Sequence, residues 1–479
     1  GCYNTAVGHQ ALTANTTGTN NVALGYKALF TNTTGEKNTA VGMEALKANT
    51  TAGYNTAVGY QALYTNTIGK RNTAVGYEAL KVNTVGQYNV AVGNEALKAN
   101  TTGNDNIAIG YTTLEDNTTG VKNVGVGNYA LSNNTIGTKN VALGGYSLNL
   151  NTTGISNIAV GYNALATNTI GNYNIAVGQD SLRYNTTGIN NTAIGYETLK
   201  NNTTASYNTA VGYHALACNT TGQYNVALGF HALKANTTAN YNVAAGYQAL
   251  EDNTTGEFNV AIGYGALREN TVGKENTALG YYALRKNTTG CQNVAIGKQA
   301  LVNNLTGKSN VAIGRDAMTN AVSANQNVAI GPGSLYNNTG GSNNVAVGTG
   351  TLAYNTTGQK NVVIGVDTMR CNTVGTHNIA IGEQALYCNT TAGYNIGIGV
   401  DSLYRNTTGQ YNVGVGYQTL NDNTTGNCNV AVGFRALKCN VTGGQNVALG
   451  SCALCANVSA IDNVAIGNQA LKSLTGQHT

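Results

Sequence analysis

The sequence has little charge, almost no proline and no tryptophan. Of its 479 residues only 9% are charged, and Pro332 is the single proline. Ordinary soluble domains carry roughly 25% charged residues, so the composition argues against conventional globular domains. The net charge of +5 is spread along the chain and forms no basic patch of the kind that binds nucleic acid.

Sequence features typical of membrane proteins, enzymes and metalloproteins are missing as well. The sequence contains no run of about 18 apolar residues that could span a membrane, and no signal-peptide pattern. It holds no nucleophile–base constellation, and its Cys and His spacings do not match zinc sites. We therefore expect no catalytic residue, no metal site and no cofactor. His214 and His231 stand 17 residues apart, but they lack a third ligand, and we interpret their spacing as coincidence.

A strict repeat takes the place of these features. An Asn recurs every 17 residues from Asn4 to Asn463, which makes 28 units. Numbered from this Asn as position 1, the consensus reads N-x-A-x-G-Y-x-A-L-x-x-N-T-T-G-x-x. Asn at position 1 and Gly at position 5 never vary, and position 9 is Leu except at Met318 and Met369.

The repeat predicts an all-β fold. Seventeen residues are too few for a helical-pair repeat, and the invariant Gly and the β-branched residues disfavour a helix. One unit fits one coil of a parallel β-solenoid, with neighbouring coils about 4.8 Å apart. We expect residues 1–479 to form a single uninterrupted array of 28 coils whose register starts at Asn4. Because neither end carries a cap, we expect a segment of a longer array, or chains that stack end to end.

Tolerance to substitution suggests where the side chains point. We expect positions 2, 4, 9 and 14 to face the core. The Asn residues of positions 1 and 12 should form amide ladders between coils, and the Gly of position 5 should adopt a positive φ; Asn225 and Gly229 represent positions 1 and 5. Position 3, represented by Ala227, should then face outward. Since it is almost always Ala, we interpret it as a lateral interface with another chain.

Asn-x-Thr/Ser triplets begin at position 12 of 19 units. They match the acceptor motif for N-glycans, but Asn-Thr-Thr is also ordinary turn chemistry. Substitutions such as Ile68 destroy the triplet without disturbing the repeat, which favours the structural explanation. The candidate glycosylation sites are Asn15, Asn32, Asn49, Asn100, Asn117, Asn151, Asn185, Asn202, Asn219, Asn236, Asn253, Asn287, Asn304, Asn355, Asn389, Asn406, Asn423, Asn440 and Asn457.

Tyrosine and cysteine also fall into columns. Tyr occupies position 6 in eleven units and position 17 in others, including Tyr224, where the rings could bind sugars or simply stabilise the stack. Cys371 and Cys388 share one position in consecutive coils, at a Cα separation suited to a disulfide. Either an oxidised staple, as in extracellular proteins, or two free thiols would fit this placement.

The pentapeptide NVAIG, at 259–263, 293–297 and 310–314, resembles the head repeats of trimeric autotransporter adhesins. The longer NTAVGYQAL, at 55–63, is similar to repeat arrays of bacterial surface and phage tail-fibre proteins. The resemblance implies a left-handed roll, an extracellular, cell-surface or virion-surface setting and a trimer. This sequence departs from the adhesin pattern in its longer coil, and it contains no neck, stalk or membrane anchor.

Three functions follow as hypotheses. The first is an extracellular structural filament that assembles by stacking of coils, with lateral association and glycan decoration as additional features. The second is an adhesin or tail-fibre rod that binds glycans or matrix. The third, ice binding through Thr columns, is weaker because adjacent Thr residues at positions 13 and 14 point to opposite sides.

Overall fold

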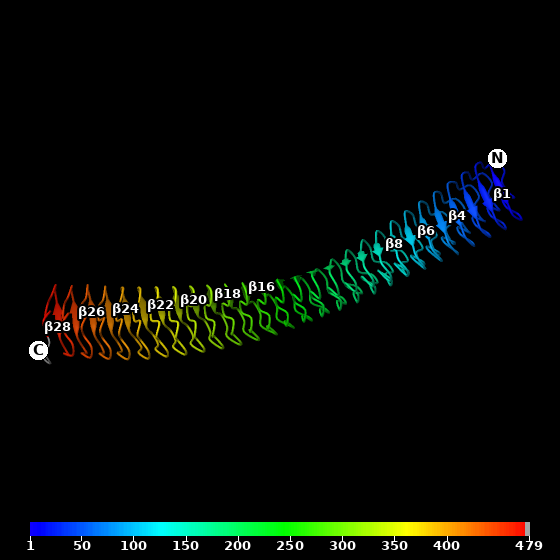
Figure 1. The fold of residues 1–479 in the computed structure, drawn as a ribbon. Helices are drawn as coiled ribbons and strands as arrows, with labels where there is room; N and C mark the ends of the chain where they lie inside the picture. Colours follow the sequence, from blue (N-terminus) through cyan, green and yellow to red (C-terminus); the bar gives the residue numbers. More distant parts are fainter. Residues whose placement is uncertain (475–479) are drawn as a thin grey trace. The chain divides into compact units, whose positions relative to one another are not determined.

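The computed structural model describes residues 1–474. They form two units, Gly1–Asn240 and the residues from Tyr241 onward, which run from blue to green and from green to red (Figure 1). Each unit is a run of coils, and each coil contributes one strand of three residues.

The strands of the first unit are β1 (Thr5–Val7), β2 (Val22–Leu24), β3 (Thr39–Val41), β4 (Thr56–Val58), β5 (Thr73–Val75), β6 (Val90–Val92), β7 (Ile107–Ile109), β8 (Val124–Val126), β9 (Val141–Leu143), β10 (Ile158–Val160), β11 (Ile175–Val177), β12 (Thr192–Ile194), β13 (Thr209–Val211) and β14 (Val226–Leu228). Those of the second unit are β15 (Val243–Ala245), β16 (Val260–Ile262), β17 (Thr277–Leu279), β18 (Val294–Ile296), β19 (Val311–Ile313), β20 (Val328–Ile330), β21 (Val345–Val347), β22 (Val362–Ile364), β23 (Ile379–Ile381), β24 (Ile396–Ile398), β25 (Val413–Val415), β26 (Val430–Val432), β27 (Val447–Leu449) and β28 (Val464–Ile466).

Within each unit, every strand pairs in parallel with the strand one coil away. Thr209 of β13 pairs with Val226 of β14, and Val260 of β16 pairs with Thr277 of β17, each an offset of 17 residues. The parallel β-solenoid with a 17-residue coil is therefore confirmed. No helix occurs among residues 1–474, and so none that is long and apolar enough to cross a membrane.

The two faces of the strand are opposite to our expectation. Ala227, at position 3, is completely buried, whereas Val226 and Leu228 on either side are partly exposed. The same burial pattern recurs in nearly every strand. Position 14 also points outward, since Ile68 and Ile136 are 50% and 52% exposed. The predictions that positions 2, 4 and 14 face the core, and that Ala227 belongs to a lateral interface, are wrong.

The reason is the width of the coil. Position 3 faces the Ala of position 8 and the Leu of position 9, all of which are buried, so only a small side chain fits there. Gly occupies position 3 opposite some larger residues of position 8. A Cβ added to Gly125 would lie 2.7 Å from Cγ2 of Thr113, and one added to Gly414 would lie 2.7 Å from Oγ of Ser402. The Ala stripe is therefore a packing requirement of a thin core.

Two asparagine ladders cross this core, as predicted. At position 1, the backbone N–H and Nδ2 of Asn225 both donate to Oδ1 of Asn208, at 3.0 and 3.2 Å. At position 12, Nδ2 of Asn219 donates to Oδ1 of Asn202 and to the carbonyl of Gly222. The buried amides are thus satisfied by the neighbouring coil, which is what a buried polar group requires.

Four positions of each coil bend the chain through positive φ. Gly229 has φ 130°, as expected for the invariant Gly of position 5. Positions 7, 9 and 17 also lie in the left-handed region with ordinary side chains, for example His214 (53°), Leu216 (52°) and Tyr207 (62°). Such residues cost free energy in isolation, so the stacking of the coils must stabilise these turns.

Candidate functional site

The asparagines proposed as glycan acceptors lie inside the coils. All of the candidates except Asn15 are completely buried, and the Nδ2 atom that would carry the sugar is engaged in the position-12 ladder. Asn15 is half-buried, and its Nδ2 donates to the carbonyl of Gly18 at 3.1 Å. A glycan on a buried acceptor would displace the ladder and the next coil, so the folded coils cannot carry the predicted column of glycans.

The aromatic columns are ladders of stacked rings. Tyr213 lies between Tyr196 and Phe230, with ring centroids 5.4 and 5.3 Å apart and planes within 11°. Tyr224 stacks on Tyr207 at 5.0 Å, and in the second unit Tyr264 lies between Tyr247 and Tyr281. Because neighbouring rings cover the faces, such a column presents ring edges to solvent. This favours stabilisation of the stack over a stacking platform for sugars.

The outer face of the strands is the largest apolar surface of the chain. Positions 2 and 4 carry only Val, Ile, Leu, Thr and the single Ala245, and no charged residue. Many of these side chains are about two-fifths exposed, as in Ile109 (40%), Ile194 (40%) and Leu279 (44%). Two flat columns of aliphatic side chains therefore run along each unit. A contiguous apolar surface of this extent marks an interaction site in soluble proteins.

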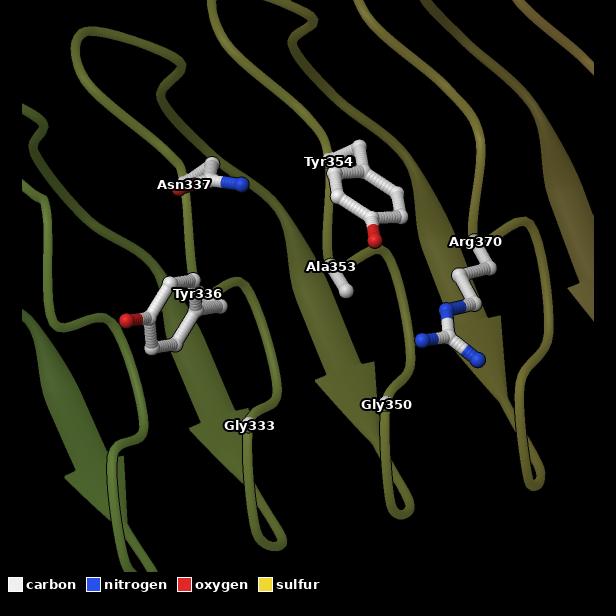
Figure 2. Close-up of a pocket in the computed structure, with 7 residues that line it drawn as sticks. All are labelled: Gly333, Tyr336, Asn337, Gly350, Ala353, Tyr354 and Arg370. Carbon is white, nitrogen blue, oxygen red and sulfur yellow. The ribbon is translucent and has the colours of Figure 1, made fainter.

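A hollow of about 230 Å³ opens in the second unit, on the side of the coil formed by positions 7, 10 and 11. Its floor is Gly350 and Ala353, at positions 7 and 10 of one coil, and Gly333 extends it into the preceding coil. Figure 2 shows the rings of Tyr336 and Tyr354 beside this space.

Arg370 closes the hollow from the following coil, and Asn337 lines its other end (Figure 2). The guanidinium of Arg370 donates to Oδ1 of Asp367 at 3.2 Å and lies 5.7 Å from the ring centroid of Tyr354. Burial opposes its charge, but Asp367 and Tyr354 together raise the pKa of Arg370. The group therefore stays cationic at every ordinary pH.

Positions 7 and 10 hold ion pairs in several other coils. Lys47 lies 2.7 Å from Glu44, and Lys98 contacts both Glu95 and Glu78, at 2.7 and 2.9 Å. Hydrogen bonds from Lys47 and Gln61 hold the pKa of Glu44 below its usual value. These charges are paired with one another, so this side of the coils has no uncompensated catalytic carboxylate at those points.

The cysteine pair is stacked as expected, and its oxidation state stays a prediction. Cys371 and Cys388 occupy the same position in consecutive coils and are free thiols in this structure. Both are half-buried, and burial raises the pKa of each thiol; the neighbouring Cys371 raises that of Cys388 further. Raised pKa values lower the thiolate fraction and slow oxidation at neutral pH.

The histidine column also matches the sequence. The rings of His214 and His231 stack with centroids 5.6 Å apart, and Nε2 of His214 lies 3.3 Å from Glu197. Across residues 1–474, no group of three His, Cys, Asp or Glu side chains is placed to hold a metal ion.

Comparison with known proteins gives no assignment, since no protein-family model matches the chain and no curated protein is significantly similar to it. The surface features above therefore carry the functional argument. Sequence reasoning missed two of them, the aliphatic strand face and the hollow at Gly350. The hollow has a sequence signal, because only this coil combines Gly at position 7 with Ala at position 10.

Proposed function

We propose that the chain is a structural fibre subunit whose copies associate side by side through the outer face of the strands. The observation that supports this most is the pair of exposed aliphatic columns at positions 2 and 4. Each coil satisfies its own buried amides through the asparagine ladders, so the coils need no ligand to be stable. The strand face is what remains exposed to water at a cost.

The area available is ample for a stable contact. Two side chains that are about two-fifths exposed present on the order of 100 Å² per coil. About eight coils would then supply the roughly 800 Å² per partner that a stable interface buries. Each of the two units holds 14 strands, so either could form such a contact alone.

A second copy of this chain is the occupant that fits the surface best. Sheet-on-sheet packing requires two flat faces with matching strand spacing, and an identical solenoid supplies the same spacing over its whole length. The absence of charge at positions 2 and 4 removes any repulsion between two copies. The proposal places the fibre outside the cell or on a cell or virion surface and includes end-to-end stacking; the resemblance to adhesin head repeats supports both.

The alternatives receive different support. An adhesin or tail-fibre rod would use the hollow beside Tyr336 and Tyr354 rather than the aromatic columns, whose ring faces are covered. Ice binding through Thr is disfavoured because the position-13 hydroxyls are engaged: Oγ1 of Thr220 donates to the carbonyl of Thr237 at 3.0 Å. Position 4, the partner column of position 2, never holds Thr.

Electron microscopy of the purified chain tests the proposal. We expect elongated particles joined along their sides, and fibres as the concentration rises. Particles that remain single at every concentration would contradict the structural-fibre function. Fibres that end in a distinct terminal head would favour the adhesin alternative.

A further inference from the structure

The hollow at Gly350 has the features of a built binding site. In other coils positions 7 and 10 carry long side chains that contact each other, such as Glu44 and Lys47 at 2.7 Å. In the coil that starts at Asn344 both positions are reduced to Gly350 and Ala353. The missing side chains leave a notch one coil wide, and its floor at Ala353 is only 9% exposed.

Two tyrosines line the notch with ring faces that no other ring covers. Tyr336 and Tyr354 are 38% and 47% exposed, and neither takes part in an aromatic stack within residues 1–474, unlike the column tyrosines. Free aromatic faces pack against the C–H surface of a sugar ring, while their hydroxyls remain available for hydrogen bonds. The volume of about 230 Å³ is below that of sites for drug-sized ligands and suits a single ring.

The polar groups around the notch are donors. Asp367 uses one nitrogen of Arg370, and a guanidinium has five N–H groups, so others remain free for a ligand. Oδ1 of Asn337 accepts from Nδ2 of Asn320 at 2.8 Å, which fixes the orientation of this amide. Its nitrogen then points toward the side of Tyr354 (Figure 2). No carboxylate lines the hollow.

We propose that this notch binds a sugar ring that carries a carboxylate, of the uronic-acid type. The ring packs on Tyr336 and Tyr354, the carboxylate meets the guanidinium of Arg370, and the amide of Asn337 donates to a ring hydroxyl. A charge-assisted Arg–carboxylate contact is the strongest polar interaction available here, so it provides the preference for acidic over neutral sugars. This site is independent of the strand face, and either proposal can fail without the other.

Calorimetric titration of the full chain with glucuronic acid tests the site, with glucose as the neutral probe and benzoate as a carboxylate without a sugar. We expect weak, millimolar binding of glucuronic acid, on the order of tenfold tighter than that of glucose or benzoate. Arg370→Gln should remove this preference, and Gly350→Gln should block binding of all three probes by filling the notch.

The Gly350→Gln variant is expected to fold. Gly350 has φ 64°, and other coils hold long side chains at this position with similar values, such as Glu44 (60°) and Gln248 (55°). Gly265→Gln, at the same position with φ 59°, is the matched control outside the notch and should bind like the unmodified chain. Absence of glucuronic acid binding, equal binding of glucose, or unchanged binding by Gly350→Gln would each overturn the proposal.

Discussion

The side-chain nitrogen of Asn219 donates a hydrogen bond to Oδ1 of Asn202, 3.0 Å away in the preceding coil. The Oδ1 atom of Asn219 in turn accepts from Nδ2 of Asn236 at 2.9 Å. This contact makes the conserved amide of the triplet a structural element and removes it from the surface.

Replacement of Asn219 by Ala should therefore destabilise its coil. The change leaves the buried Oδ1 of Asn202 and the carbonyl of Gly222 without a donor, at a cost of about 1–3 kcal/mol each. Hydrogen exchange measured by mass spectrometry should show faster exchange in the adjoining coils. Thr221→Val is the control: it destroys the same triplet at an exposed position that holds Val272 in another coil, and it should leave exchange unchanged. Normal protection in Asn219→Ala would contradict the role of the ladder.

The two glycine positions should respond differently to Ala. Gly212 has φ 135°, and a Cβ there would contact the carbonyl oxygen of Gly229 in the next coil, so Gly212→Ala should cost about 1–3 kcal/mol of unfolding free energy. Gly222→Ala should change stability by less than about 1 kcal/mol, because Ala205 and Ala239 occupy the same position in the coils on either side. Chemical denaturation compares the two variants, and equal effects would be inconsistent with this account of the turns.

The sequence was sufficient to predict the solenoid, its period and its strictest residues. Invariance of Asn225 and Gly229 within the repeat follows from one hydrogen-bond pattern and one backbone angle, and both are visible as columns. Leu216 is buried as predicted, because a large aliphatic residue that never becomes polar must lie in the core.

The orientation of the strand could not be predicted in the same way. A two-residue period defines two faces but does not say which is buried, and we assigned the larger aliphatic residues to the core. The coil is too thin for them, so Ala227 lies inside and Leu228 outside. A signal was present in the pairing of Gly125 with Thr113, which shows that position 3 trades volume with position 8. The positive φ of Leu216 had no signal, since Leu rarely adopts it.

Acid should weaken the ion pair between Glu44 and Lys47. The pKa of Glu44 is lowered in the folded chain, so the pair stabilises the fold above the pKa of the unfolded state, near 4.5. That stabilisation is lost as the pH falls through the lower, folded pKa. Unfolding free energies of the unmodified chain and of Glu44→Gln should therefore differ at neutral pH and converge in acid. A constant difference across this range would show that the charge has no part in it.

Cys371 and Cys388 should form a disulfide in an oxidising medium. Equivalent Cα atoms of stacked coils lie about 4.8 Å apart, within the roughly 4.4–6.8 Å that a disulfide allows. Because burial raises both pKa values, the bond should form faster at alkaline pH. Peptide mapping without reduction should find the linked pair, and Cys218, which has no cysteine at its position in adjacent coils, should remain alkylatable. Full alkylation of Cys371 and Cys388 after oxidation would rule the staple out.

The central claim is that copies of the chain meet through positions 2 and 4, and the particle mass from light scattering tests it most directly. One variant replaces Ile109, Leu143 and Ile194 of the strand face by Lys. Its control replaces Ile68, Ile136 and Ile170, which are 50%, 52% and 51% exposed at position 14, and adds the same charge elsewhere. We expect the unmodified chain and the control to form dimers or larger assemblies, and the strand-face variant to remain at the monomer mass of 49.3 kDa. Equal masses for all three would contradict the claim.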